Sequence, residues 1–283
     1  RYLEPTESFR SAWQYQNLMY MTAGLLTEKI SGMEWEDHTR KKIFEPLGMS
    51  SANFDITTFP NLPDAAVGYV EREEGELKVM DYHPLPAIGP AGSINASAAD
   101  MGKWVSLHLN GGKVGDKQLI TASSLRDLHR SRMYVGSNGG AGVSHTGYAL
   151  GWFTYDWNGN YIIEHGGNID GFSALVYMAP KENIGFVILT NKNGTDYGSF
   201  VARYALDILT GKESTDYYTA DEDEGDEDEE EEDAEEDEAD DQESPFANTE
   251  PQRKNDAYAG TYLDPGYGEV TISEVKGKLR LQY

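Results

Sequence analysis

Residues 148–190 read YALGWFTYDWNGNYIIEHGGNIDGFSALVYMAPKENIGFVILT, a stretch in which short apolar runs alternate with turn residues. Asn158-Gly159 is typical of a two-residue hairpin turn, and Pro180-Lys181-Glu182-Asn183 indicates a second turn. We expect strands at residues 148–157, 161–164, 173–178 and 184–190. Consecutive strands joined by such short turns run antiparallel, so the stretch predicts an antiparallel sheet.

Helical patterns surround these strands. Apolar residues recur at helical spacing across residues 17–31, and Gly32 ends that run. We expect further helices at residues 34–44, 97–109, from Thr121 or Ser123 to near residue 130, and 199–209. Residues 64–82 favour a short hairpin, and residues 132–146, rich in glycine and serine, indicate a loop. Helices, then an antiparallel sheet, then a covering helix predict an α+β fold in which helices flank the sheet.

The net charge of −26 is concentrated in one acidic run. Residues 221–243 hold 19 acidic and no basic side chains, so the rest of the chain carries only −7, an ordinary value for a soluble protein. Such a run repels itself and has few apolar residues, which predicts a disordered linker that is open to a protein partner. No basic stripe is present to neutralise phosphates, so we expect no nucleic-acid partner.

The sequence thus divides into an α+β domain at residues 1–212, an acidic linker at 213–250 and the start of a small β-domain at 251–283. The last part stops too soon to close a stable sheet. No stretch reaches the ~20 apolar residues that cross a bilayer, so we expect no membrane-spanning segment. The chain has no cysteine for a disulfide or a thiolate metal site, and it begins with Arg1 rather than methionine. We expect a fragment, cut at both ends.

Two short motifs carry the candidate chemistry. Tyr15-Gln16-Asn17 stands just ahead of the first expected helix, and His165-Gly166-Gly167 lies in the expected sheet. Each motif alone is typical of plain structure, namely a core tyrosine with a helix-capping asparagine, and a bulge marked by glycine. The two motifs become informative together, through their order, their separation and the segments between them. The other histidines show no metal-ligand spacing, and we expect structural or surface roles for His38, His83, His108, His129 and His145.

With the segments between them, these motifs resemble the class C β-lactamase-related, penicillin-binding-protein-like serine hydrolases. The resemblance rests on five ordered blocks at residues 15–32, 44–49, 91–101, 151–152 and 164–172. Residues 258–262 onward are similar, more weakly, to the small β-domain that is often appended to these enzymes. The implied fold is a β-lactamase-like α+β domain that is incomplete at its N-terminus. The implied compartment is extracytoplasmic, although the residues themselves leave it unknown.

The resemblance implies acyl transfer through a serine, without cofactor or metal, on an amide or ester of a small molecule or peptide. It makes Tyr15 the base or proton shuttle, which requires a neighbouring positive charge because a free phenol titrates near pH ~10. That charge would come from the lysine of a Ser-x-x-Lys motif. Asn17 would bond the substrate amide and the same lysine. His165 would hold a substrate carboxylate when protonated, or relay a proton to Tyr15 when neutral.

Gly166 and Gly167 would leave a strand edge bare, so that a substrate lies against it as an added strand. The backbone N–H of Asn168 would form one half of the oxyanion hole, and the N–H of the nucleophilic serine the other half. We expect no Ser-x-x-Lys in this chain. Thr39-Arg40-Lys41-Lys42 has the corresponding spacing but follows the Tyr-x-Asn motif, so the order in the family places the nucleophile before Arg1.

Two functions stay open at this point. The first is a serine hydrolase, with a peptidase, esterase or β-lactamase-like activity, of which this chain alone would be inactive. The second is a catalytically inactive binding or scaffold protein of the same fold. The sequence upstream of Arg1 discriminates between them, because a Ser-x-x-Lys there supports the enzyme and its replacement supports the scaffold.

Overall fold

A computed structural model describes residues 5–72, 75–136, 143, 145–214, 217, 253–265 and 268–282. The chain divides into two compact units, residues 10–218 and residues 1–9 with 219–283. The acidic run lies outside the described residues, so its predicted disorder is untested. The domain boundaries expected at residues 212 and 250 likewise stay predictions.

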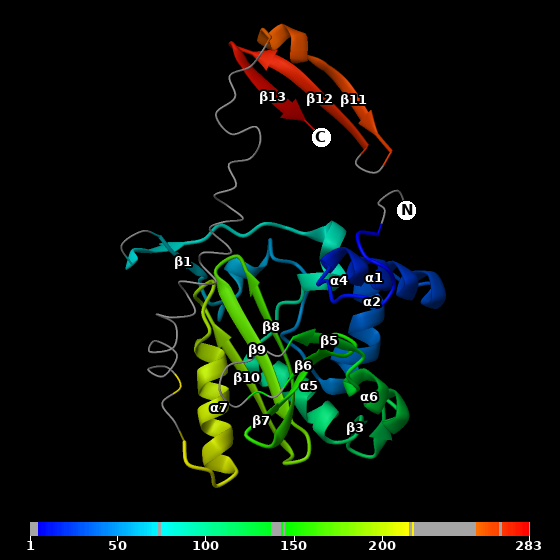
Figure 1. Cartoon of the computed structure of the whole chain (residues 1–283), viewed down its shortest axis with the longest axis vertical. Coiled ribbons are helices and arrows are strands. Elements are labelled where there is room, and N and C mark those ends of the chain that lie inside the picture. Colours follow the sequence, from blue (N-terminus) through cyan, green and yellow to red (C-terminus); the bar gives the residue numbers. More distant parts are fainter. Residues whose placement is uncertain are drawn as a thin grey trace. The chain divides into compact units, whose positions relative to one another are not determined.

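The larger unit is built on one six-stranded antiparallel sheet in which neighbours in sequence are neighbours in space, in the order β10-β9-β8-β7-β6-β5 (Figure 1). Its strands are β5 (Met133–Gly136), β6 (Thr146–Tyr148), β7 (Phe153–Trp157), β8 (Asn160–Ile169), β9 (Phe172–Ala179) and β10 (Ile184–Thr190). Asn158 and Gly159 have φ values of 46° and 78°, as a type I′ hairpin turn requires. The antiparallel sheet and this turn confirm the sequence prediction.

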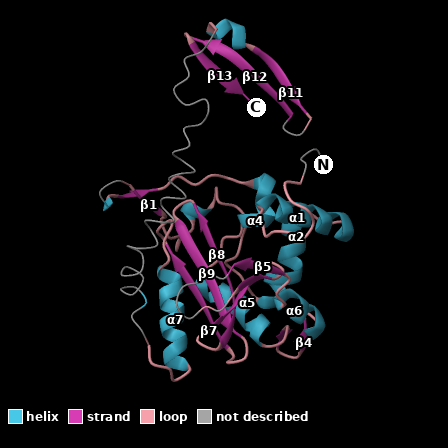
Figure 2. Ribbon diagram, viewed as in Figure 1, coloured by secondary structure: helices cyan, strands magenta, loops and turns pink. Residues whose placement is uncertain are grey.

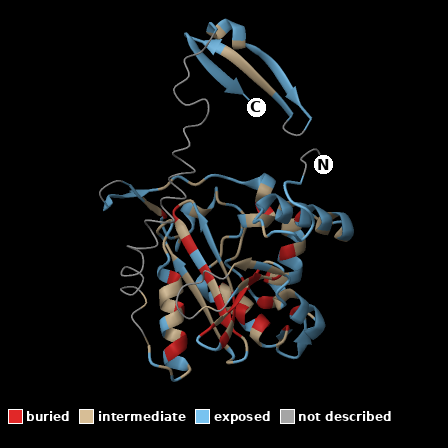
Figure 3. Cartoon of the chain, in the orientation of Figure 1, coloured by how far each residue is buried: buried red, intermediate tan, exposed pale blue. Residues whose placement is uncertain are grey.

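Two helices cover the two faces of the sheet, α5 (Ala98–Leu109) and α7 (Tyr197–Leu209). Alternate side chains of a strand point to opposite faces, and both faces are apolar here. Ile162 packs in one core with Leu206 of α7, whereas its neighbour Ile163 packs in another with Val105 of α5. Figure 3 shows buried residues along the middle strands and on both helices. The covering helix expected at residues 199–209 is α7.

The strand bounds differ from the prediction in two places. β8 does not stop at Glu164 but continues through the His-Gly-Gly motif to Ile169. Residues 132–146, expected to form a loop, include β5 and the start of β6, which pair with each other.

A helical part precedes the sheet in the sequence (Figure 2). It consists of α1 (Asn17–Ser31), α2 (Trp35–Thr39), a π-helical turn η1 (Arg40–Phe44) and α3 (Glu45–Leu47). The helix α1 has the predicted bounds and ends at Gly32, whose φ of 70° is left-handed. The single helix expected at residues 34–44 is instead two elements, α2 and the π-helical turn η1. Phe44 of η1 shares a third core with Leu107 of α5.

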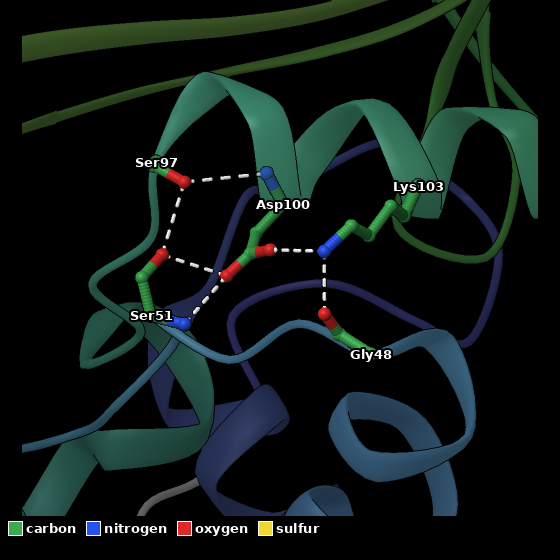
Figure 4. Close-up of polar contacts among 5 residues, drawn as sticks. All are labelled: Gly48, Ser51, Ser97, Asp100 and Lys103. Carbon is green, nitrogen blue, oxygen red and sulfur yellow. Dashed lines mark hydrogen bonds and ion pairs between the residues drawn. The ribbon is translucent and has the colours of Figure 1, made fainter.

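Polar contacts join α5 to the segment after α3 (Figure 4). Ser97 caps α5, because its hydroxyl oxygen accepts the N–H of Asp100 at 3.3 Å. The carboxylate of Asp100 accepts the N–H of Ser51 at 2.7 Å and pairs with Lys103 at 2.7 Å. Burial alone would raise the pKa of Asp100, but Lys103 and Ser51 lower it to about 2. The carboxylate is therefore ionised at neutral pH and holds the two segments together.

The remaining elements of this unit are short. They are η2 (Phe59–Asn61), β1 (Tyr69–Glu71), β2 (Leu77–Val79), η4 (Pro86–Ile88), α4 (Gly89–Gly92), β3 (Lys113–Val114), β4 (Lys117–Gln118) and α6 (Ala122–His129). The strands β1 and β2 form the hairpin predicted within residues 64–82. The cap of α6 is Thr121 rather than Ser123, since the Thr121 hydroxyl accepts a backbone N–H at 3.1 Å.

The smaller unit contains η5 (Asn255–Tyr258) and a three-stranded antiparallel sheet of β11 (Gly260–Asp264), β12 (Gly268–Val275) and β13 (Lys278–Gln282). All of β11 and β13 is exposed, and β12 is half-buried at most. The predicted strands are present, but they enclose no core among the described residues. None of the described helices combines the length and the apolar character needed to cross a membrane.

Candidate active site

The strand β8 has two partner strands along only part of its length. β7 pairs with it as far as Glu164, whereas β9 pairs with it as far as Ile169. From His165 onward, one edge of β8 has no strand partner among the described residues. Gly166 and Gly167 are exposed at this edge, and a Cβ at Gly167 would meet no atom within 4 Å. The backbone there is open to a ligand.

The rings of Tyr15 and His165 meet beside this edge, with centroids 6.0 Å apart. Tyr15 precedes α1 and is 47% exposed, and His165 is half-buried on β8. The two motifs therefore lie together in space, although 150 residues separate them in the sequence. Three further aromatic rings surround the pair, those of Trp13, Tyr148 and Phe153.

The two ring nitrogens of His165 have different partners. Nδ1 lies 2.6 Å from the carbonyl oxygen of Gly166, and a carbonyl only accepts, so Nδ1 carries the proton. Nε2 lies 3.1 Å from the hydroxyl of Tyr148, which donates to it when the imidazole is neutral. Burial lowers the pKa of His165, against a smaller opposite effect of the Gly166 carbonyl. These contacts and burial together favour the neutral imidazole at pH 7.

Tyr148 is a site residue that the motifs did not identify. Tyr148 is the last residue of β6 and pairs with Phe153 of β7. This pairing places the ring of Tyr148 next to His165. Tyr20 of α1 lies beside it, and burial raises the pKa of both phenols. Tyr148 is thus held as a neutral hydrogen-bond donor. No sequence signal gave this contact, because it depends on the pairing of β6 with β7.

The two asparagines of the motifs have different surroundings. Asn17 is the first residue of α1 and is exposed, and the cap of the helix is Gln16, whose Oε1 accepts a backbone N–H at 3.0 Å. Asn17 is therefore not the capping residue. Asn168 lies at the open edge, and its Oδ1 accepts the hydroxyl of Ser173 and the N–H of Gly194, the latter at 3.2 Å. These bonds attach the end of β8 to the segment after β10.

One Ser-x-x-Lys does occur, Ser273-Glu274-Val275-Lys276, so the expectation that the chain has none is wrong. It lies at the end of β12, with Lys276 in the following turn at φ 53°. Residues three apart point to opposite faces of a strand but share one face of a helix. Lys276 is therefore not held beside this serine as it would be on a helix. The other candidate, Thr39, is 6% exposed within α2 and cannot meet a substrate.

Glu164 precedes His165 and points to the opposite face of β8, toward α7. Burial raises the pKa of Glu164 to about 7, against an opposite effect of Arg203. Its carboxyl group is therefore on the face of β8 opposite to that of His165. Among the described residues, one acidic group has ligand atoms within 4.8 Å of one another, that of Glu28, Glu34 and Glu36. Exposed acidic groups are common without a metal, and we assign no metal site to it.

Comparisons with known proteins give a consistent result. The family model described as Beta-lactamase matches residues 1–210. The unguisins hydrolase ungD of Aspergillus violaceofuscus is 28% identical, across 99% of this chain and 53% of its own length. The octameric penicillin-binding protein homologue from Pyrococcus abyssi superposes with a TM-score of 0.64 at 23% identity, covering 96% of this chain and 53% of that one.

A class C β-lactamase superposes with a TM-score of 0.57 at 17% identity, covering 76% of this chain and 61% of that one. These two structures have the β-lactamase-like α+β fold that the sequence predicts for residues 1–212. The chain spans about half the length of the curated relative it matches.

Proposed function

The chain belongs to the Beta-lactamase family, and from that premise we propose that the protein is a serine hydrolase that acts through an acyl-enzyme on an amide or ester. The observation that carries the proposal is the meeting of Tyr15 and His165, 6.0 Å apart between ring centroids, beside a strand edge bared by glycine. The chain spans about half of its curated relative, so the proposed activity is that of the whole protein.

The proposed nucleophile is a serine of a Ser-x-x-Lys segment outside residues 1–283. Its hydroxyl proton passes to Tyr15 while its oxygen attacks the carbonyl carbon, and Tyr15 then returns the proton to the leaving group. Water cleaves the resulting acyl-enzyme. Of the two roles implied for His165, the neutral relay is the one that its burial supports, and it requires the Tyr15 hydroxyl to take the place of the Tyr148 hydroxyl at Nε2. The imidazolium that would hold a carboxylate is disfavoured by burial. Asn17, at the start of α1, is proposed to bond the substrate amide.

The substrate is proposed to lie along the open edge of β8 as an added strand, where Gly166 and Gly167 present no side chain. The backbone N–H of Asn168 is the proposed donor of the oxyanion hole on this strand. The side chain of Asn168 is already bonded to Ser173, so it is not needed for this role. Removal of one such donor typically lowers the rate ~10²–10³-fold.

Covalent labelling tests whether the whole protein carries the nucleophile. We expect a fluorophosphonate probe to label one serine of the full-length protein and to leave the 283-residue chain unlabelled. Ester or amide turnover should disappear with labelling. A full-length protein that is neither labelled nor active on esters, amides or β-lactams would overturn the proposal.

The substitution Tyr15→Phe tests the proposed base. Acylation of the full-length protein should fall ~10²–10⁴-fold, because the proton of the serine loses its acceptor. The matched control is Tyr204→Phe on α7, since Tyr204 is also 47% exposed. We expect the control to retain full activity and both variants to keep the wild-type melting temperature. Unchanged acylation in Tyr15→Phe would remove Tyr15 from the mechanism.

The second candidate is a catalytically inactive binding or scaffold protein of the same fold. The observation that favours it concerns the two candidate nucleophiles among the described residues, since Ser273 lies on a strand and Thr39 is buried. The acidic run at residues 221–243 would then be the proposed contact for a protein partner. The labelling experiment separates the two candidates.

A further inference from the structure

Asn168, which carries the proposed oxyanion donor, lies at a corner of the six-stranded sheet. On one side of it β7 pairs with β8 only as far as Glu164. On the other side β10 pairs with β9 only as far as the pair Thr190 and Ser173, and Ser173 is the partner of Asn168. Beyond this level the sheet is a ribbon of two strands, which is marginal in water without further support. A fixed direction for the N–H of Asn168 therefore requires contacts from outside the ribbon.

The direction of this N–H follows from the turn that joins β8 to β9. Asp170 and Gly171 both have positive φ, 42° and 90°, as a two-residue type I′ turn requires. The two residues that flank such a turn exchange hydrogen bonds, and the next pair along the ladder does not. Asn168 and Ser173 are that next pair. The N–H of Asn168 hence points away from β9, toward the open edge of β8.

The side chains of this pair meet behind the open edge, on the face of the sheet that α7 covers. Leu175, two residues beyond Ser173, packs in one core with Leu206 of α7, and alternate residues of a strand share a face. Ser173 is 8% exposed, and its hydroxyl donates to Oδ1 of Asn168. His165, three residues before Asn168, faces the other way. Ser173 can therefore act on the reaction only through Asn168.

The segment after β10 completes the contacts of Ser173. Its Oγ lies 2.8 Å from the carbonyl oxygen of Lys192 and accepts the N–H of Thr195 at 3.3 Å. A hydroxyl has one proton, so Ser173 donates to Asn168 or to Lys192 at any moment. Oδ1 of Asn168 in turn accepts the N–H of Gly194 at 3.2 Å. Ser173 thus connects the end of β8 to a segment that belongs to neither strand of the ribbon.

We propose that Ser173 is a positioning residue, whose hydroxyl holds the side chain of Asn168 and so fixes the direction of the Asn168 N–H at the oxyanion. The inference rests on the proposed function for its effect on catalysis. Oxyanion donors act because they are preorganised, and a misplaced donor lowers the rate of the chemical step. The ground-state substrate makes little use of such a donor, so kcat should change and KM should not.

Turnover of 4-nitrophenyl acetate by the full-length protein tests this role. We expect Ser173→Ala to lower kcat ~10-fold, less than the ~10²–10³-fold of a donor that is lost, and to change KM less than ~2-fold. Ser106→Ala on α5 is the matched control, because it removes a serine hydroxyl that donates to a backbone carbonyl at 2.8 Å. The control should keep both constants. A wild-type kcat in Ser173→Ala would overturn the inference.

A double-variant cycle tests whether Ser173 acts through Asn168. Asn168→Ala removes the side chain, which donates nothing in the proposed mechanism, and keeps the backbone N–H, so it should also lower kcat ~10-fold. Because both changes break the same connection, the double variant should again be ~10-fold slower than wild type rather than ~100-fold. Losses that multiply would mean that Ser173 acts by another route, and would contradict the assignment.

The order of the N–H can be measured without turnover, by ¹⁵N relaxation of the full-length protein. The order parameter of the Asn168 amide should fall from ~0.85 in the wild type toward ~0.6 in Ser173→Ala. The amide of Ile162, in the buried half of β8, should stay unchanged. A merely structural role would lower the melting temperature and leave the Asn168 amide as ordered as before. That result would overturn the inference.

Failure of the two ideas is distinguishable. If the wild-type protein hydrolyses neither esters nor amides, the proposed function fails, and the order parameter of the Asn168 amide alone supports or overturns the inference. If the wild type is active and Ser173→Ala matches it in kcat and in amide order, the proposed function stands and the positioning role is wrong.

Discussion

The imidazole of His165 faces its own backbone on one side and a phenol on the other. The carbonyl of Gly166 can only accept, which fixes the proton on Nδ1 and leaves Nε2 to accept from Tyr148. A lysine at this position would bring a permanent positive charge into the cleft. The neutral ring brings no such charge, and the ring of Tyr15 lies next to it, with centroids 6.0 Å apart.

The substitution Tyr148→Phe tests this arrangement at the scale of one hydroxyl group. The bond from Tyr148 to Nε2 stabilises the neutral imidazole, so its loss should raise the pKa of His165 and move the acid limb of kcat/KM to higher pH. The change in the pKa of His165 should correspond to the free energy of one neutral hydrogen bond, ~0.5–1.5 kcal/mol. Nitrogen NMR of the imidazole gives both the pKa and the tautomer.

The control for this substitution is Tyr134→Phe on β5, where the tyrosine is 59% exposed. We expect the control to keep the wild-type pKa and tautomer. A purely structural role for Tyr148 would lower stability but leave the titration of His165 in place, and that result would contradict the assignment.

The motifs predicted Tyr15 and His165 because each stands next to a strong local signal, the start of a helix and a pair of glycines. Their convergence in the structure agrees with the family order, while their catalytic roles stay predictions. Tyr148 and Tyr20 were beyond prediction, since neither has a local signal. They lie on β6 and α1, and only the tertiary arrangement of those elements brings the two phenols together.

At the scale of the element, the two halves of β8 have different surroundings. Its first half is buried between β7 and β9, and its second half, from His165, has one edge open. The glycines in and after that second half differ in whether a side chain could fit at their position. Gly167 has open space around its Cβ position, whereas Gly171, in the turn, has a φ of 90°, and a Cβ there would lie 2.6 Å from the backbone of Gly68.

Two substitutions separate these properties. Gly167→Val should leave the melting temperature within a few degrees of wild type, because valine suits a strand and its Cβ meets no atom within 4 Å, yet it should reduce turnover ~10²-fold by covering the edge. Gly171→Ala should instead destabilise the fold by at least ~1 kcal/mol, because alanine is strained at that φ and clashes with Gly68. Thermal melting and kcat/KM distinguish them. Loss of folding in Gly167→Val would show that the edge is structural.

The contact between α5 and α6 predicts an acid-sensitive element. His108 of α5 is 4% exposed, and its Nδ1 lies 2.8 Å from Nε2 of His129. Burial, and then the neighbouring His129, lower the pKa of His108 to about 3. Because the unfolded chain takes up the proton first, the contribution of His108 is complete above pH ~6.5 and is lost as the pH falls toward 3, at ~1.4 kcal/mol per pH unit.

The variant His108→Phe removes this titration. Between pH 7 and pH 4.5 its free energy of unfolding should fall by ~2–3 kcal/mol less than that of the wild type, as measured by urea denaturation. The raised pKa of Glu164 acts in the opposite direction, giving stability as the pH falls from 7 to 4.5, but it is present in both proteins and cancels. His38→Phe is the control and should follow the wild type. Parallel curves for His108→Phe and wild type would contradict the prediction.

Some elements were predictable and others were not, for reasons that lie in particular residues. The strand β10 and the helix α1 have the predicted bounds because their apolar patterns are long and regular. The π-helical turn η1 has no signal of its own within residues 34–44. The glycines and serines of residues 132–146 predict a loop, because the pairing of β5 with β6 has no local signal in the sequence.

At the scale of the whole molecule, 19 of the acidic side chains are in residues 221–243, and the rest of the chain is near −7. A run of like charge cannot pack, so we expect no contribution from it to the stability of the larger unit. Deletion of residues 221–243 should change the melting temperature of residues 10–218 by less than ~2 °C, since ~1 kcal/mol corresponds to ~2–4 °C in a domain of this size. Calorimetry of the two proteins at equal ionic strength measures this. A drop of ten degrees would show that the run supports the fold.

Whether a side chain of β8 faces Tyr15 or α7 depends on whether its position along the strand is odd or even. His165 faces Tyr15, and Glu164, one step earlier, faces α7. An insertion of one amino acid into the strand ahead of Glu164 would exchange the two, so that a carboxyl group met Tyr15 and an imidazole entered the core. An insertion of two would restore the original order. Related chains can therefore lengthen this strand only by pairs of residues and still keep the same catalytic groups.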